Sequence, residues 1–74
     1  MGRKQSAGIE NRIRELRARH RMTQADLAEA IDVSRQTIVA IEKGEYNLSM
    51  LLGLRIAKVF DEPLGSIFWL AEKV

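Results

Sequence analysis

Four consecutive side chains able to form hydrogen bonds open one segment of the chain: Ser34, Arg35, Gln36 and Thr37. This segment is the second of two predicted helices within residues 24–43. Both have apolar residues at helical spacing, and a tight turn joins them. The apolar positions that turn the two predicted helices toward each other are Leu27, Ala28, Ile31, Val33, Ile38 and Ile41. The four polar side chains are left pointing outward. Two helices packed through a buried apolar contact, with hydrogen-bonding side chains exposed at the start of the second, suit the base edges in a DNA major groove.

A catalytic site finds little support in the residues available. The sequence contains no cysteine, which excludes disulfides, thiolate metal sites and thiol catalysis. His20 is the only histidine and has no second ligand at metal-binding spacing, and there is no Gly-rich phosphate loop. Ser34 lies near Asp32 and beside Arg35, but a helix cap explains this serine better than a nucleophile does. The sequence therefore predicts no enzyme, no cofactor and no metal.

The length and composition indicate one small globular domain. A chain of 74 residues buries only about 60% of its unfolded surface, and a content of 46% hydrophobic and 30% charged residues is ordinary for a folded protein. No apolar run approaches the roughly 18 residues of a membrane span, and no secretory segment opens the sequence. We therefore expect a cytoplasmic protein with no membrane partner. The opening MGRKQS matches the M-G-x-x-x-S pattern of N-myristoylation, which short segments match easily, and a cloning remnant is an alternative.

The charges are distributed unevenly along the chain. Residues 1–21 hold seven basic and two acidic residues, a balance of +5, whereas residues 22–74 hold five basic and eight acidic residues, a balance of −3. A basic face on a mildly acidic domain suits a polyanion such as DNA. An ordinary solvated helix face explains the basic segment equally well. A membrane-surface helix explains it less well, because the segment lacks a bulky apolar face.

The start and stop signals predict five helices in an all-α domain. Residues 1–8 read as a flexible basic arm, residues 9–70 as the domain, and residues 71–74 as a tail. The predicted helices span residues 9–19, 24–31, 35–43, 50–60 and 64–69. Thr23, Ser34 and Ser49 are the expected N-caps; Gly44 ends the third helix, and Pro63 suits the start of the fifth. Residues 69–74 fit either a frayed helix end or a short strand.

The segment QADLAEAIDVSRQTIVAIEKGEYN closely resembles the helix-turn-helix of the Cro/CI-type, or xenobiotic-response-element, family of prokaryotic DNA-binding proteins. The upstream NRIRELRARHRMTQ and the downstream MLLGLRIAKVF extend the resemblance to about residues 11–68. It implies a lambda-repressor-like fold with a recognition helix at about residues 35–43. It also implies a small stand-alone transcriptional regulator that binds double-stranded DNA through the major groove.

The resemblance implies roles for individual residues. Arg35 and Gln36 would read base edges, Arg35 through a guanidinium fork suited to guanine and Gln36 through an amide suited to adenine. Val39 and Ala40 would add only apolar base contacts. The implied phosphate contacts are Thr23, Gln24, Ser34, Thr37, Lys43, Tyr46 and Asn47. Gln24 would also brace Arg35. For Thr37, Lys43 and Tyr46 the alternative is a polar surface without a binding role.

Two further features come from comparing the chain with this family's pattern. Arg17 and Glu42 stand where relatives place an ion pair between the first and third helices. Asp32 stands where the family's turn usually has Gly, and Asp tolerates a left-handed backbone better than most residues. With Arg17 engaged in the pair, the basic residues left as candidates for phosphate contact are Arg12, Arg14, Arg19 and Arg21.

The C-terminal half carries more apolar residues than one buried helix face explains. Such an excess usually indicates a partner, and a two-fold homodimer would set two recognition helices about one DNA turn apart. The residues expected at this interface are Leu52, Ile56, Val59, Phe68, Trp69 and Leu70. Alternatively, Trp69 and Leu70 only complete the monomer core. We expect a repressor, because a chain without an effector domain acts most simply by occluding polymerase; the alternative function is an antitoxin that uses the apolar surface to bind a toxin.

Overall fold

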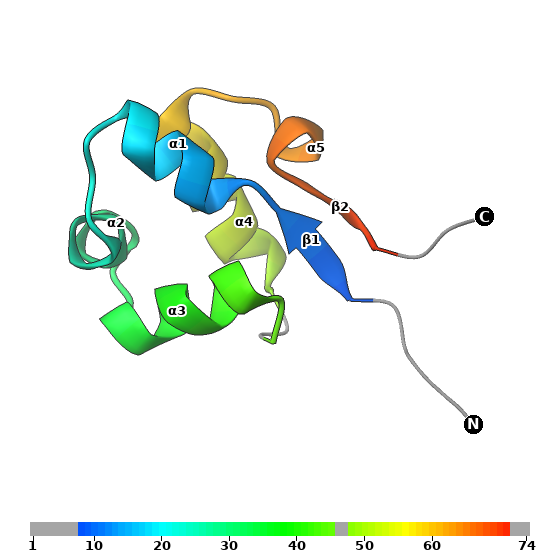
Figure 1. Cartoon of the computed structure of the whole chain (residues 1–74), viewed down its shortest axis with the longest axis horizontal. Helices are drawn as coiled ribbons and strands as arrows, with labels where there is room; N and C mark the ends of the chain where they lie inside the picture. The colour runs from blue at the N-terminus through cyan, green and yellow to red at the C-terminus, as the bar shows by residue number, and fades with distance from the viewer. Residues whose placement is uncertain (1–7, 46–47, 72–74) are drawn as a thin grey trace.

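The computed structural model describes residues 8–45 and 48–71. In this part of the chain five helices and a two-stranded antiparallel sheet follow one another (Figure 1). The elements in chain order are β1 Ile9–Asn11, α1 Ile13–Arg19, α2 Gln24–Ile31, α3 Arg35–Lys43, α4 Met50–Phe60, α5 Leu64–Ile67 and β2 Phe68–Leu70. The five-helix architecture predicted from the sequence is confirmed, with the small sheet as an addition.

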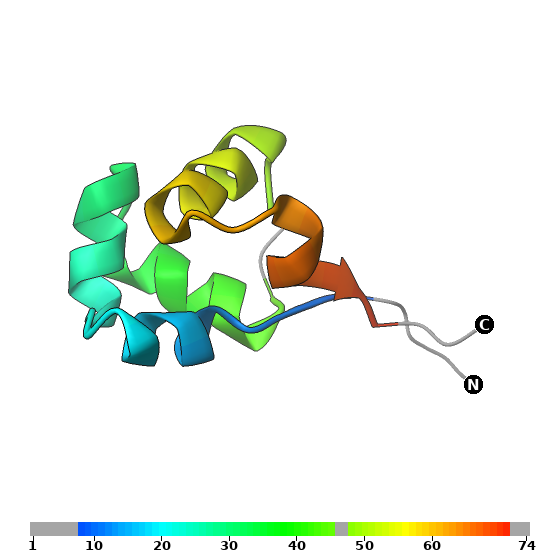
Figure 2. The same ribbon diagram turned by 90° about the horizontal axis from the view of Figure 1, so that it is seen from above.

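The helices enclose one apolar core. Figures 1 and 2 show α1 to α4 grouped at one end of the molecule and the two strands extending away from them at the other. The buried side chains come from all five helices: Ile13, Leu16, Leu27, Ala28, Ile31, Ile38, Ile41, Leu52, Ile56, Phe60 and Ile67. Within the described residues no polar or charged residue is fully buried. No helix in this part of the chain is long and apolar enough to cross a membrane.

The central helices begin and end at the predicted residues, because their capping groups make the expected contacts. The hydroxyls of Thr23, Ser34 and Ser49 each accept a hydrogen bond from a backbone N–H in the first turn of the following helix. Gly44 ends α3 in the left-handed conformation at φ 76°. Asp32 ends α2 with φ 63° and ψ 50°, so the turn keeps the left-handed geometry that was expected of it.

The prediction of a helix from residue 9 is wrong for its first four residues. Ile9–Asn11 form β1, and α1 begins only at Ile13. The side-chain oxygen of Asn11 accepts a hydrogen bond from the Ile13 N–H at 3.1 Å, and its amide donates to the Ile41 carbonyl at 3.0 Å. Asn11 thus ties the chain to α3 just before the helix starts. The preceding backbone pairs with β2 and does not coil.

The fifth helix is shorter than predicted, and the segment after it is a strand. α5 ends at Ile67, and β2 pairs with β1 in the register Ile9 with Leu70, Glu10 with Trp69 and Asn11 with Phe68. Of the two alternatives left open for this segment, the strand is therefore the one the structure contains. The sheet brings both ends of the described chain to the same side of the molecule (Figure 1).

Candidate nucleic-acid interface

Helices α2 and α3 form a helix-turn-helix. Leu27, Ala28 and Ile31 of α2 pack with Ile38 and Ile41 of α3 in the common core. The start of α2 is fixed by a capping box, in which Thr23 and Asp26 exchange two hydrogen bonds of 2.9 Å each. Hydrogen bonds from the backbone and side chain of Thr23 hold the pKa of the Asp26 carboxyl below its ordinary value of 3.8.

The outward side of α3 carries the four polar residues noted in the sequence. The Ser34 hydroxyl accepts a hydrogen bond from the Thr37 N–H at 3.2 Å, and the two hydroxyls lie 3.0 Å apart. Ser34 and Thr37 therefore cap the helix, and any contact with phosphate would come in addition to this role. Arg35 and Gln36 are exposed. Their side chains form no hydrogen bond or ion pair to another residue in the described segments, so both are available to a ligand.

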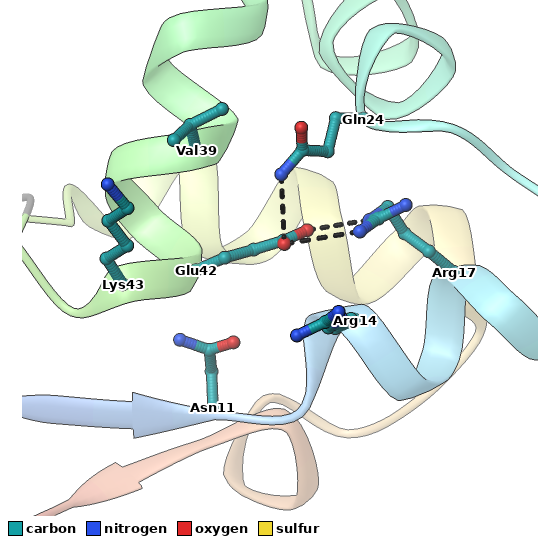
Figure 3. Close-up of a pocket in the computed structure, with 7 residues that line it drawn as sticks. All are labelled: Asn11, Arg14, Arg17, Gln24, Val39, Glu42 and Lys43. Carbon is teal, nitrogen blue, oxygen red and sulfur yellow. Dashed lines mark hydrogen bonds and ion pairs between the residues drawn. The ribbon is translucent and has the colours of Figure 1, made fainter.

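A cluster of three side chains, Arg17, Gln24 and Glu42, joins α1, α2 and α3 (Figure 3). Arg17 Nε lies 2.6 Å from Glu42 Oε2, and Arg17 Nη2 lies 3.2 Å from Glu42 Oε1. The remaining guanidinium nitrogen of Arg17 donates to the Met22 carbonyl at 3.1 Å. Because the side chains of Arg17 and Glu42 are only 14% and 11% exposed, the ion pair expected between them is part of the architecture.

Gln24 joins the same cluster through a contact that differs from the expected one. Its Nε2 donates to Glu42 Oε1 at 3.2 Å, so Gln24 is braced against Glu42 and not against Arg35. The reason is geometric: the carboxylate of Glu42 accepts from Arg17 and still has lone pairs free for an amide donor. Gln24 nevertheless opens α2, where the first backbone N–H groups of a helix favour an anion.

An open depression of about 540 Å³ lies between α1 and the helix-turn-helix. The residues that line it are Asn11, Arg14, Arg17, Gln24, Val39, Glu42 and Lys43. Figure 3 shows Val39 and Lys43 of α3 across from Arg14 and Asn11, with Glu42 between them. Arg14 was one of four arginines left as candidates for phosphate contact from the sequence, whereas Asn11 was not assigned to the site. Their placement depends on how α1 packs over α3, which spacing along the chain does not reveal.

The other predicted phosphate contacts lie at several places. Thr23 is at the start of α2, and Lys43 is exposed beside the depression. Val39 and Ala40, expected to make apolar base contacts, are half-buried on α3. The assignments to Tyr46 and Asn47 fall outside the described residues.

Two of the N-terminal arginines are engaged elsewhere. Arg12 donates from Nε to the Ser66 carbonyl at 2.6 Å, and its Nη2 lies 3.5 Å from Glu62, so it binds the segment around α5. Arg19 lies 2.6 Å from Glu15 in an exposed pair one turn apart. Arg14 takes part in none of the ion pairs or side-chain hydrogen bonds within residues 8–45 and 48–71, and it lines the depression.

The residues expected at a dimer interface separate into two groups. Leu52 and Ile56 are only 9% and 0% exposed, so they belong to the core of the single chain and are corrected from interface to core residues. Val59 and Phe68 are half-buried against that core. Outside the core, the exposed large apolar residues are Met50, Leu51, Leu54, Trp69 and Leu70. The apolar surface is therefore real, but it lies on the N-terminal part of α4 and on β2.

Comparisons with known proteins agree with this geometry. A helix-turn-helix family model, HTH_3, matches residues 13–67. The chain is 46% identical over 65 residues to the uncharacterized HTH-type transcriptional regulator YgzD of Bacillus subtilis, covering 88% of this chain and 98% of that protein. It is 48% identical over 60 residues to the uncharacterized HTH-type transcriptional regulator MJ0272 of Methanocaldococcus jannaschii, covering 81% and 91%. The crystal structure of the transcriptional regulator VanUg shares the fold, with a TM-score of 0.75 at 24% identity over 95% of this chain and 93% of that one.

Proposed function

The chain belongs to the helix-turn-helix family of Cro/CI-type DNA-binding transcriptional regulators, and from this premise we propose that it binds a two-fold-related operator as a homodimer and represses transcription. Members of this family are DNA-binding regulators and not enzymes. The observation that carries the proposal is the outward placement of Arg35 and Gln36 on a capped, well-packed α3.

Sequence discrimination would rest mainly on these two side chains. Arg35 offers two parallel donors to guanine O6 and N7, and Gln36 offers a donor and an acceptor to adenine N7 and N6. Val39 and Ala40 follow one turn later on α3 and could add only apolar contacts, for which a thymine methyl is the natural partner. We therefore expect a short recognition sequence in each half-site.

Contacts with the DNA backbone would fix the orientation of α3 in the groove. Gln24 opens α2 and Lys43 ends α3, and both line the depression beside α3, so their side chains can meet the phosphate backbone there. Thr23, Ser34 and Thr37 lie at the starts of α2 and α3, and they would contact phosphates there. Tyr46 and Asn47 remain proposed phosphate contacts on the family resemblance alone.

Homodimerisation is supported by the exposed apolar residues of α4 and β2. Leu70 is 66% exposed and Trp69 is 43% exposed, although both are large apolar side chains. An apolar depression lined by Ile9, Leu48, Ser49, Met50, Gly53, Leu64 and Phe68 lies at the same end of the molecule. A second copy would cover this surface and provide the second recognition helix of a two-fold site. Phe68 lines this depression and would lie at the interface; Val59, near the C-terminal end of α4, remains a proposed interface residue on the apolar sequence pattern alone.

Repression is proposed because a protein bound over promoter DNA blocks polymerase, and the site of action would be the cytoplasm. The antitoxin alternative gains no support, since the relatives are named as transcriptional regulators.

A reporter experiment tests repression: a duplex selected by the protein is placed between the two core elements of a reporter promoter. The proposal expects reporter output to fall when the wild-type protein is present and to recover with Arg35→Ala. A rise in output would contradict repression.

A further inference from the structure

The depression between α1 and α3 carries more positive than negative side chains, which the packing of the helix-turn-helix alone does not require. Three cationic residues and one carboxylate line it: Arg14, Arg17, Lys43 and Glu42. Arg17 and Glu42 neutralise each other through the two hydrogen bonds of their ion pair. Two cations therefore remain, Arg14 on one wall and Lys43 on the other (Figure 3).

The depression opens on the side of the molecule that would meet DNA. Its lining includes Gln24 at the start of α2 and Val39 on the outward side of α3, both of them proposed DNA contacts. The capping carboxylate of Asp26 accepts the N–H of Thr23, so it does not occupy the N–H groups of the next residues in the first turn. An anion seated here would meet two cations beside Gln24, the residue that opens α2.

Resting on the proposed DNA binding, we propose that this depression seats one backbone phosphate, held by Arg14 together with Lys43. Arg14 is thereby a further DNA-positioning residue, and α1 becomes part of the interface. Two neighbouring arginines do not compete for this role, because Arg12, which precedes α1, is bound to Ser66 and Glu62, and Arg19 at the end of α1 is bound to Glu15. Arg14 is exposed, so in the DNA-free protein its charge is solvated and carries no desolvation penalty from burial.

The test uses the full chain with two fluorescently labelled duplexes of equal length, one selected from a random pool and one scrambled. Arg14→Gln is compared with Arg19→Gln, which removes the same charge from the same helix about 140° around its axis. We expect Arg14→Gln to weaken both duplexes by about five- to tenfold. It should also reduce the slope of log affinity against log salt by about 0.9 for each half-site, and so by about 1.8 for the dimer on its full site. Arg19→Gln should change affinity by less than about twofold.

A second measurement identifies the phosphate itself. Neutral methylphosphonates are introduced one at a time into the selected duplex. At one position per half-site, the methylphosphonate should weaken binding by the wild-type protein. The same substitution should not weaken binding by Arg14→Gln any further, because that variant already lacks the contact. Additive losses at every position, or an Arg14→Gln variant that binds like Arg19→Gln, would overturn the inference.

These outcomes are separable from the proposed function. If the wild-type protein binds both duplexes equally well, sequence-specific regulation fails, yet the difference between the two arginine variants still decides the role of Arg14. If the wild-type protein binds neither duplex, both proposals fail. If Gln36→Ala loses discrimination while Arg14→Gln binds normally, only the present inference fails.

Discussion

Arg17 and Glu42 lie 25 residues apart in sequence and join α1 to the end of α3 through two hydrogen bonds of 2.6 and 3.2 Å. Glu42 Oε1 also accepts from Gln24, so a single carboxylate fixes the relative placement of the first three helices. These helices carry the residues proposed to contact DNA. The orientation of the proposed interface therefore depends on one nearly buried ion pair.

Removal of this carboxylate should destabilise the fold strongly. Glu42→Gln leaves the Arg17 guanidinium with 14% exposure and no counter-charge, and we expect the free energy of unfolding to fall by about 3 kcal/mol. Glu15→Gln is the matched control, because the half-exposed Glu15 carboxylate pairs with Arg19 and, at 3.5 Å, with Arg12, and its removal should cost less than about 1 kcal/mol. Urea denaturation measures both. Equal losses for the two variants would show that the Glu42 pair has no special structural role.

Gln36 should carry discrimination at one base position. Gln36→Ala is expected to lose about 1–3 kcal/mol of binding on the selected duplex and to tolerate base changes at that position. Gln24→Ala, by contrast, should weaken selected and scrambled duplexes by similar factors, because a phosphate contact carries no sequence information. Fluorescence anisotropy with single-base variants of the duplex measures both effects. A uniform loss for Gln36→Ala would refute its role in base reading.

The capping box at the start of α2 should make stability depend on acid pH. The pKa of Asp26 is lowered in the folded protein by its hydrogen bonds to Thr23, so the folded state binds protons less readily than the unfolded state. The stabilisation is therefore complete above the ordinary value of 3.8 and is lost as the pH falls through the lower folded pKa. Asp26→Asn should lower the melting temperature at neutral pH. The difference in melting temperature between this variant and the wild type should become smaller below pH 3.8.

Thr23→Ala provides the comparison for this effect, because it removes the hydroxyl partner and leaves the carboxyl in place. It should move the acid transition of Asp26 back toward 3.8. NMR titration of the Asp26 carboxyl resonance follows the change directly. A wild-type carboxyl that titrates at its ordinary value would contradict the capping account.

The exposed apolar residues of β2 should control self-association. Trp69→Ala and Leu70→Lys are expected to shift sedimentation toward the monomer, since each removes apolar area from the proposed interface or adds a charge to it. Ala30→Lys on α2, at the opposite end of the molecule (Figure 1), is the control and should sediment like wild type. A dimer that persists in both β2 variants would move the interface elsewhere.

The sequence predicted the bounds of α2, α3 and α4 because their signals are local. Thr23, Ser34 and Ser49 cap the helices beside them, and Gly44 supplies a left-handed stop. The first strand was missed for the opposite reason. Ile9 and Ile13 have helical spacing, but residues 9–11 pair with residues 68–70, which local periodicity cannot foresee.

The candidate site was predicted less completely than the fold. Arg35 and Gln36 follow from the position of the turn, but Arg14 depends on the packing of α1 across α3. The bracing of Gln24 depends on a carboxylate 18 residues away. Leu52 and Ile56 were assigned to an interface because α4 is apolar on almost every side, and only the packed structure distinguishes its inner face from its outer one.

Selection of binding sites from a pool of random duplexes by the wild-type protein tests the central claim most directly. The account predicts enrichment of a two-fold-related sequence whose half-site centres lie about 10 base pairs apart, the separation that two recognition helices of a dimer require. Arg35→Ala and Gln36→Ala should each lose preference at matching positions in both halves. Failure of the wild-type protein to enrich any sequence above the starting pool would contradict the account.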